Sequence, residues 1–201
     1  MCVLLAALGA AVSIQSGAAL QGASPTAVAA LPSCAVSATT SGSPSAGAND
    51  ARPAWQTMAM TDVRTGRQFA IGDFRGCTVY VETMANWCGA CRHQLGNVAE
   101  AEKSLDRDRF VFIAISVETD LSPADLASYA KDAGFDWVFS VGSPAMLKAL
   151  VDEFGRGAIV PPSTPHVIVA PDGSFGDLHT GYSQPDELVR LMTAASGAAG
   201  G

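Results

Sequence analysis

Residues 110–117 read FVFIAISV, an uninterrupted apolar run of strand length. Such a strand is apolar on both faces, which is typical of the interior of a sheet that is covered on both sides. Residues 77–81 and 167–170 form shorter runs that are also mostly apolar. The runs therefore predict an α/β fold in which helices pack against a central sheet.

Helical patterns lie between these runs. Apolar residues at helical spacing share one face over residues 91–105. Ser122-Pro123 and Ser143-Pro144 each combine a favoured N-cap with proline at the first helical position, and each predicts the start of a helix. A last helix is expected to begin at residues 183–185.

Two further segments resemble strands. Residues 55–71 predict a β-hairpin that turns at Thr65-Gly66. Pro171-Asp172-Gly173 predicts a turn into a strand over residues 175–178.

The charge of the chain is unevenly distributed. Residues 1–49 contain no Asp, Glu, Lys or Arg, although the whole chain of 201 residues contains 31 of them. We expect residues 1–22 to be a signal peptide or hydrophobic anchor, since the run is apolar but short for a membrane span. Residues 23–52 are rich in Ala, Ser, Gly, Pro and Thr and predict a flexible linker. Residues 53–197 then form the folded domain.

This organisation predicts an exported protein, periplasmic or extracellular, which touches a membrane only through its leader. Leu31-Pro32-Ser33-Cys34 loosely resembles a lipobox, so lipidation of Cys34 is an alternative to a free linker cysteine. The formal net charge of −7 argues against binding to nucleic acid.

The reactive chemistry lies in Cys88-Gly89-Ala90-Cys91, which follows a predicted strand and begins a helix. Unpaired N–H groups and the helix dipole stabilise a thiolate at that position. A structural zinc site is the main competing interpretation, but it requires four ligands, and the sequence has no second Cys pair of this spacing. The motif therefore predicts a redox dithiol with no metal and no cofactor.

The segment Ala85-Asn86-Trp87-Cys88-Gly89-Ala90-Cys91-Arg92, with Gly72-Asp73-Phe74-Arg75-Gly76 before it and Thr164-Pro165 after it, resembles the thioredoxin superfamily. Within that superfamily it is similar to the exported TlpA/ResA-like thiol–disulfide oxidoreductases. The resemblance implies a thioredoxin fold: a three-layer α/β/α sandwich with a mixed central sheet and an N-terminal β-hairpin extension.

The resemblance also implies roles for individual residues. Cys88 would attack a disulfide of a protein substrate, Cys91 would resolve the mixed disulfide, and Glu82 would serve as a buried acid that moves protons. Trp87 would line the substrate site. A cis peptide bond at Thr164-Pro165 would expose the Thr164 peptide groups to the substrate.

Several alternatives stay open. Pro161 and Pro162 compete with Pro165 for the cis bond, and His166 is either near the sulfurs or on the surface. Ala90 stands where TlpA-like chains often have proline, which leaves open whether the protein is a reductant or an oxidant. Cys77 is expected to be a small apolar core residue.

Two other functions compete with the oxidoreductase. A peroxiredoxin-like peroxidase would need a hydroxyl near the cysteine, but Ala85 stands where threonine is typical. A Sco-type copper protein would use the two cysteines and a distal histidine, for which His166 is the candidate. For the oxidoreductase, the implied partners are a protein with a disulfide and an electron donor in the membrane.

Overall fold

The computed structural model describes residues 52–198, so the expected leader and most of the linker lie outside the described residues. A four-stranded sheet with the order β5–β4–β3–β6 forms the centre. β3 is parallel to β4, β4 is parallel to β5, and β6 is antiparallel to β3. The bounds are β3 Thr78–Met84, β4 Phe110–Ser116, β5 Val138–Val141 and β6 His166–Val169.

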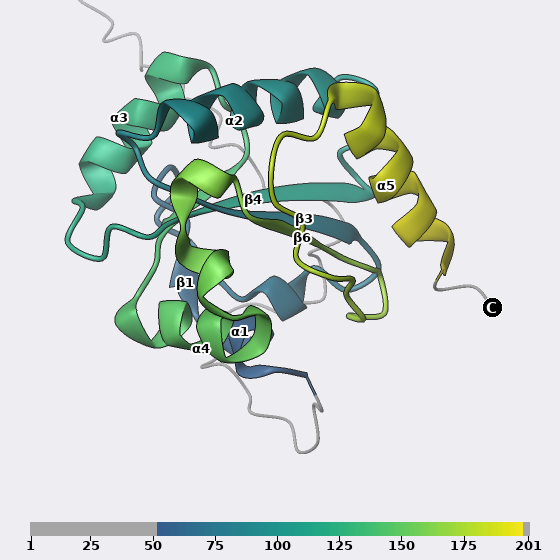
Figure 1. Cartoon of the computed structure of the whole chain (residues 1–201), viewed down its shortest axis with the longest axis horizontal. Helices are drawn as coiled ribbons and strands as arrows, with labels where there is room; N and C mark the ends of the chain where they lie inside the picture. The colour runs from purple at the N-terminus through teal and green to yellow at the C-terminus, as the bar shows by residue number, and fades with distance from the viewer. Residues whose placement is uncertain (1–51, 199–201) are drawn as a thin grey trace, which may run out of the picture.

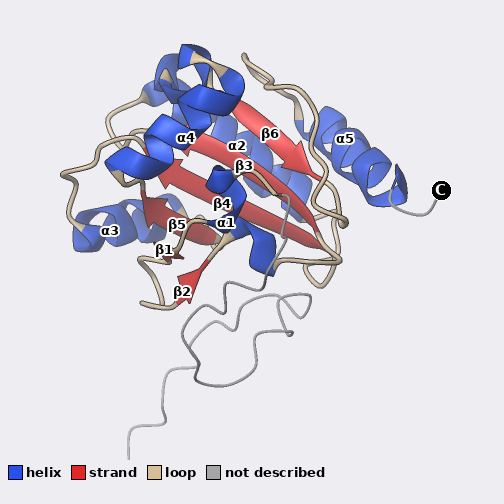
Figure 2. Ribbon diagram, turned by 90° about the horizontal axis from the view of Figure 1, so that it is seen from below, coloured by secondary structure: helices blue, strands red, loops and turns tan. Residues whose placement is uncertain are grey.

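Helices cover both faces of this sheet (Figures 1 and 2). One face packs against α2, α3 and α5, and the other packs against α1 and α4. The predicted three-layer sandwich with a mixed sheet is therefore confirmed. The helix bounds are α1 Ala54–Thr57, α2 Gly89–Glu102, α3 Pro123–Ala133, α4 Pro144–Phe154 and α5 Pro185–Ala198, with 3₁₀ helices η2 Ile71–Asp73, η3 Arg156–Ile159 and η4 Pro161–Ser163.

Every residue of β3 is buried, because both faces of this strand are covered. Successive side chains point to opposite faces of a strand. Tyr80 and Met84 accordingly belong to the core beneath α2, whereas Val79 and Val81 belong to the core beneath α4. This alternation directs Glu82 toward α2, the helix that begins at the dithiol.

Both predicted Ser-Pro helix starts are confirmed. The Ser122 hydroxyl accepts a hydrogen bond from the Asp125 N–H at 3.1 Å. The Ser143 hydroxyl accepts one from the Met146 N–H at the same distance. Gly134 ends α3 at a φ of 74°, a left-handed conformation that suits glycine.

Replacing Ser122 by alanine is expected to lower the free energy of unfolding by about 1 kcal/mol, because the Asp125 N–H loses the capping bond to the hydroxyl and keeps only its bond to the Ser122 carbonyl. Urea unfolding of the domain measures the change. Ser122→Asp is the matched control, since aspartate is an equally good N-cap and should keep most of the stability. Equal losses in the two variants would show that the capping bond contributes nothing.

The prediction for residues 55–71 is only partly correct. A short hairpin does form from β1 (Met60–Thr61) and β2 (Gln68–Phe69). The segment before it is helix α1, in which Trp55 is buried and packs edge-on against Phe154 and Phe175, with ring centroids 5.3 and 5.2 Å away. The tertiary contacts of this tryptophan determine the conformation, and they cannot be read from local alternation.

Two strand predictions also change. Residues 175–178 form no strand; the chain makes only isolated bridges there, Val169 with Phe175 and His166 with His179. Conversely, β5 was not predicted, since its four residues give too short a pattern. Its parallel pairing with β4 identifies these residues as a strand.

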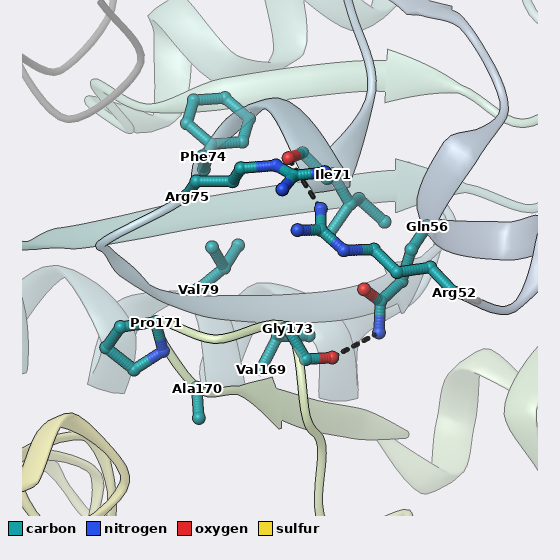
Figure 3. Close-up of a pocket in the computed structure, with 11 residues that line it drawn as sticks. Arg52, Gln56, Ile71, Phe74, Arg75, Val79, Val169, Ala170, Pro171 and Gly173 are labelled. Carbon is teal, nitrogen blue, oxygen red and sulfur yellow. Dashed lines mark hydrogen bonds between the residues drawn. The ribbon is translucent and has the colours of Figure 1, made fainter. Parts of the chain in front are cut away.

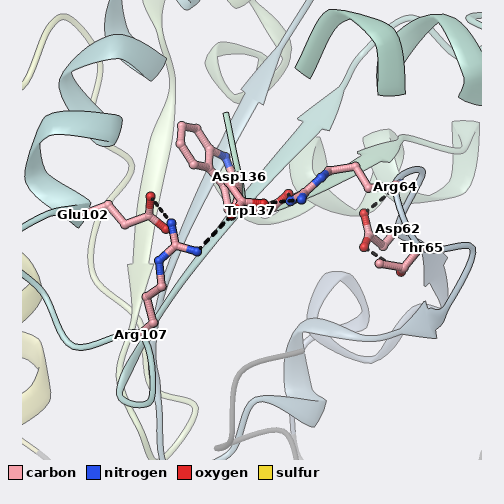
Figure 4. Close-up of polar contacts among 7 residues, drawn as sticks. All are labelled: Asp62, Arg64, Thr65, Glu102, Arg107, Asp136 and Trp137. Atoms are coloured by element: carbon pink, nitrogen blue, oxygen red, sulfur yellow. Dashed lines mark hydrogen bonds and ion pairs between the residues drawn. The ribbon is translucent and has the colours of Figure 1, made fainter. Parts of the chain in front are cut away.

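The hairpin is held to the β5 edge of the sheet by polar contacts (Figure 4). Arg64 forms an ion pair with Asp136 and donates a hydrogen bond to the Trp137 carbonyl at 2.7 Å. Arg107 forms ion pairs with Glu102 at 3.0 Å and with Asp136 at 3.3 Å.

Within residues 52–198, none of the helices combines the length and apolar character needed to cross a bilayer.

Candidate active site

The two cysteines of the dithiol lie where β3 passes into α2. Cys88 is the N-cap of α2, and its Sγ accepts a hydrogen bond from the Cys91 N–H at 3.2 Å. Cys91 lies one turn into the helix. Both are free thiols, and both are buried. The predicted position of the dithiol at a helix N-terminus is thus what the structure shows.

The electrostatics distinguish the two sulfurs. Cys88 Sγ lies at the N-terminus of α2, where it accepts a backbone N–H. Burial raises the pKa of Cys91 far above its usual value, and the Cys88 sulfur and the Glu82 charge raise it further. The Cys91 thiol donates a hydrogen bond to the Pro161 carbonyl at 3.1 Å. Cys88 is therefore suited to attack, whereas Cys91 needs a base before it can react.

Glu82 lies in the middle of β3, between Ala114 of β4 and His166 of β6, and is fully buried. Burial raises the pKa of its carboxyl group to about 8, and a hydrogen bond from Tyr80 partly offsets this increase. The Tyr80 hydroxyl donates that bond to Glu82 Oε2 at 2.8 Å. A carboxyl group that titrates near neutral pH can both accept and donate a proton.

Tyr80, Gln94 and Ser183 also belong to this site, although no local sequence pattern predicted them. Gln94 Nε2 donates to the Tyr80 hydroxyl at 3.3 Å, and Gln94 Oε1 accepts the Ser183 N–H at 3.0 Å. A polar residue at a core position of a helix was the available signal, since Gln94 precedes the apolar Leu95 on the inward side of α2.

The expected cis-proline is wrong. No cis peptide bond occurs among residues 52–198, so Pro161, Pro162 and Pro165 all follow trans bonds. The chain turns instead at Thr164, whose φ of 46° lies in the left-handed region. The η4 helix before it supplies the rest of the turn.

The peptide groups of Thr164 make internal contacts in this structure. The Thr164 N–H donates to the Pro161 carbonyl at 2.8 Å, and the Thr164 carbonyl is 2.9 Å from His166 Nδ1. Thr164 and Pro165 are both buried. A substrate contact through the Thr164 backbone stays a prediction.

Three exposed apolar side chains lie on segments connected to the dithiol or to helix α2. Among the described residues, Trp87, Val160 and Tyr182 are the large hydrophobic residues that are exposed, at 65%, 46% and 51%. Trp87 directly precedes Cys88, and Val160 directly precedes the proline whose carbonyl binds Cys91. Tyr182 packs against His93 of α2 with ring centroids 4.5 Å apart. We call these three residues the apolar rim.

Cys77 is buried, as expected. It is not a free thiol, however, because its sulfur is disulfide-bonded. The expectation that Cys77 is merely a small apolar residue is therefore wrong. Cys34, with its lipobox-like context, also lies outside the described residues.

A small pocket lies at the far end of β3 from the dithiol, beside Val79 (Figure 3). Arg52 and Gln56 reach into it, donating hydrogen bonds to the Gly72 carbonyl at 2.7 Å and the Gly173 carbonyl at 3.0 Å. These bonds fix the start of the domain against two turns. The pocket therefore has a structural role and takes no part in the dithiol chemistry.

No protein-family model matches the sequence. Among solved structures, the chain is similar to a thiol:disulfide interchange protein from Chlorobium tepidum, with 20% identity, a TM-score of 0.61, and coverage of 73% of this chain and 99% of the other. It is also similar to a secreted disulfide oxidoreductase from Mycobacterium tuberculosis, with 15% identity, a TM-score of 0.53, and coverage of 70% and 96%. The chain has a thioredoxin fold.

A copper-bound ScoI from Arabidopsis thaliana has the same thioredoxin fold, with 16% identity, a TM-score of 0.56, and coverage of 69% of this chain and 94% of the other. In the present chain, His166 is buried with Nδ1 near the Thr164 carbonyl and Nε2 3.2 Å from the Ser183 hydroxyl. Both ring nitrogens therefore already have hydrogen-bond partners. Residues 52–198 contain no group of three His, Cys, Asp or Glu side chains arranged to hold a metal ion. The donor set does not fit copper.

Proposed function

We propose that this domain is a thiol–disulfide oxidoreductase that acts on disulfides of other proteins. The observation that carries the proposal is the asymmetry of the dithiol. The sulfur of Cys88 accepts an N–H at the start of α2, and Cys91 is held as a thiol beneath it. A thiolate beside a protonated partner is the starting state for a two-step exchange.

In the first step the Cys88 thiolate attacks one sulfur of the substrate disulfide, and the other substrate sulfur leaves as a thiolate. In the second step Cys91 gives its proton to a base and attacks Cys88 Sγ. The Cys88–substrate bond breaks, and the second substrate sulfur leaves. The substrate is reduced by two electrons, and the dithiol is oxidised to a disulfide.

The apolar rim supports a polypeptide substrate. Trp87 and its two companions expose apolar side chains on segments that adjoin Cys88, the Cys91 partner Pro161 and helix α2. We propose that side chains flanking the substrate disulfide pack on this rim.

We also propose that the domain works outside the cytoplasm. The uncharged, apolar start of the sequence supports export, as does a disulfide at Cys77, because disulfides persist in oxidising compartments. A dithiol reductant in such a compartment must be reduced again after each turnover. An electron donor in the membrane is the partner that we propose for this step.

The test is a trapping experiment with Cys91→Ser. This variant keeps Cys88 and loses the resolving thiol. It is therefore expected to accumulate a covalent adduct with insulin or with another protein that contains disulfides. Non-reducing electrophoresis detects the adduct, and dithiothreitol should release it by reducing the mixed disulfide. The wild type is expected to reduce insulin and to leave no stable adduct.

Cys88→Ser is the matched control, because it keeps Cys91 and should form no adduct. An absence of adducts with Cys91→Ser, together with no insulin reduction by the wild type, would refute the proposed function.

A further inference from the structure

A chain of buried hydrogen bonds connects Glu82 to a second region of the fold. The Tyr80 hydroxyl donates to Glu82 Oε2 at 2.8 Å and receives a hydrogen bond from Gln94 at 3.3 Å. Gln94 in turn accepts the Ser183 N–H at 3.0 Å. We call Tyr80, Gln94 and Ser183 the buried relay.

The far end of the buried relay is itself fixed. The Ser183 carbonyl accepts a hydrogen bond from Asn97 Nδ2 at 3.0 Å, and the Ser183 hydroxyl lies 3.2 Å from His166 Nε2. Residues from β3, α2, β6 and the segment before α5 thus contribute to one network. Buried polar groups are costly unless they are hydrogen-bonded, and a fully bonded network holds its members in one arrangement.

The network leaves one oxygen of Glu82 without a partner. Glu82 Oε1 is buried and makes no hydrogen bond to any described residue. Oε2, by contrast, is occupied by the Tyr80 proton. Because a hydroxyl has only one proton to donate, Tyr80 directs the proton of a neutral Glu82 to Oε1.

We propose that Tyr80 and Gln94 are positioning residues, which hold Glu82 so that Oε1 accepts the Cys91 proton in the second step of the exchange. This inference rests on the proposed function. The Cys91 S–H bond breaks and an O–H bond forms at Oε1. The Cys91 sulfur then bonds to Cys88 Sγ, the Cys88–substrate bond breaks, and the departing thiolate takes a proton from water.

Electrostatics support this assignment. Besides burial and the Cys88 sulfur, the Glu82 charge raises the pKa of Cys91, so the two groups lie within electrostatic range of each other. The Tyr80 hydrogen bond lowers the pKa of Glu82, whereas burial raises it to about 8. Without Tyr80 the carboxyl group would hold its proton to still higher pH and would be a base in a smaller fraction of molecules.

Few other groups can titrate in this pH range. Burial keeps the pKa of His166 low, and burial raises the pKa values of Tyr80 and Tyr129. The ionisable and charged groups that face Glu82 and Cys91 are Tyr80 on β3, Cys88 and Arg92 on α2, Tyr129 on α3 and His166 on β6.

The test compares Tyr80→Phe with the wild type in two measurements. Carbon-13 NMR of glutamate-labelled protein, with the Glu82 signal assigned by its loss in Glu82→Gln, follows the Glu82 carboxyl directly. We expect its titration midpoint to rise by about one pH unit in Tyr80→Phe, the shift that loss of one hydrogen bond to a charged group produces.

Stopped-flow reaction with 5,5′-dithiobis(2-nitrobenzoate) separates the two chemical steps. The first release of thionitrobenzoate reports attack by Cys88, and the second reports resolution by Cys91. In Tyr80→Phe we expect an unchanged first phase and a second phase about fivefold slower at pH 7.5, with its pH profile moved upward like the NMR midpoint. A merely structural role would not shift the pH profile.

Tyr129→Phe is the matched control. It also removes a phenol hydroxyl, from the partly buried Tyr129, but that hydroxyl makes no hydrogen bond to a described residue, so both measurements should match the wild type. Gln94→Met retains the Tyr80 and Glu82 side chains but removes the hydrogen bonds from Gln94 to Tyr80 and from Ser183 to Gln94. It is expected to shift the midpoint in the same direction by a smaller amount.

The outcomes are distinct. If Tyr80→Phe has the wild-type NMR midpoint and the wild-type profile of the second phase, the positioning role is wrong and the oxidoreductase proposal stands. If Tyr80→Phe does not fold, Gln94→Met decides by the same NMR midpoint. If the wild type shows neither phase and reduces no insulin, the proposed function fails, whatever the midpoint.

Discussion

Replacing Cys88 by serine is expected to lower the rate of insulin reduction at least about a thousandfold. A serine hydroxyl does not ionise near neutral pH, so the attacking anion is lost. The variant should still fold, because serine is a favoured N-cap and can accept the Cys91 N–H in place of the sulfur. Turbidity of precipitating insulin B chain measures the rate.

The control for this prediction is circular dichroism and thermal unfolding of Cys88→Ser, which should resemble those of the wild type. A folded Cys88→Ser protein with near-normal insulin reduction would show that another thiol attacks the substrate. Cys91 would then be the remaining free thiol in residues 52–198, and its replacement in the same chain would test that outcome.

The wild-type protein is expected to lose stability with rising pH because of Glu82. The pKa of this carboxyl is about 8 in the folded protein against an ordinary value of 4.5, so the folded state binds one more proton between these pH values. Stability therefore falls as pH rises through that window. The loss attributable to Glu82 is on the order of 4 kcal/mol at the upper end.

Urea unfolding at a series of pH values from 5 to 8.5 measures this loss as the difference between the wild type and Glu82→Gln. The difference is the useful quantity, because burial lowers the pKa of His166 and gives it a pH dependence of opposite sign in both proteins. We expect Glu82→Gln to become progressively more stable, relative to the wild type, as pH rises.

Glu100→Gln is the matched control, an acid-to-amide change at an exposed position of α2, and its curve should run parallel to that of the wild type. Parallel curves for Glu82→Gln and the wild type would mean that Glu82 keeps an ordinary pKa. Glu82 would then not be poised near neutral pH to accept the Cys91 proton.

The success of prediction differed between the parts of the fold. The strand over residues 110–117 and the Ser122 and Ser143 helix starts were predicted because each depends on a local pattern of burial or capping. The helix at Trp55 was not predicted, because it depends on packing against the distant Phe154. The short strand β5 was not predicted either, because it depends on pairing with β4.

In the candidate site, too, some features were predicted from the sequence and others were not. The position of Cys88 at a helix N-terminus follows from neighbouring residues, and the structure shows it. The cis-proline was inferred from resemblance, but the structure has only trans bonds there and a left-handed turn at Thr164. The apolar rim could not be predicted beyond Trp87, because Val160 and Tyr182 come from other loops.

The class of fold and the position of the dithiol follow from patterns along the chain. Periodicity and helix-start signals act over a few residues, so they can be read directly from the chain. The side chains that support the dithiol, in contrast, are brought together only by tertiary packing. The buried relay joins Gln94 to Ser183 across 89 positions and depends on how α2, β3 and the segment before α5 pack together. No pattern along the sequence encodes such a contact, because its energy arises only when the packed core excludes water.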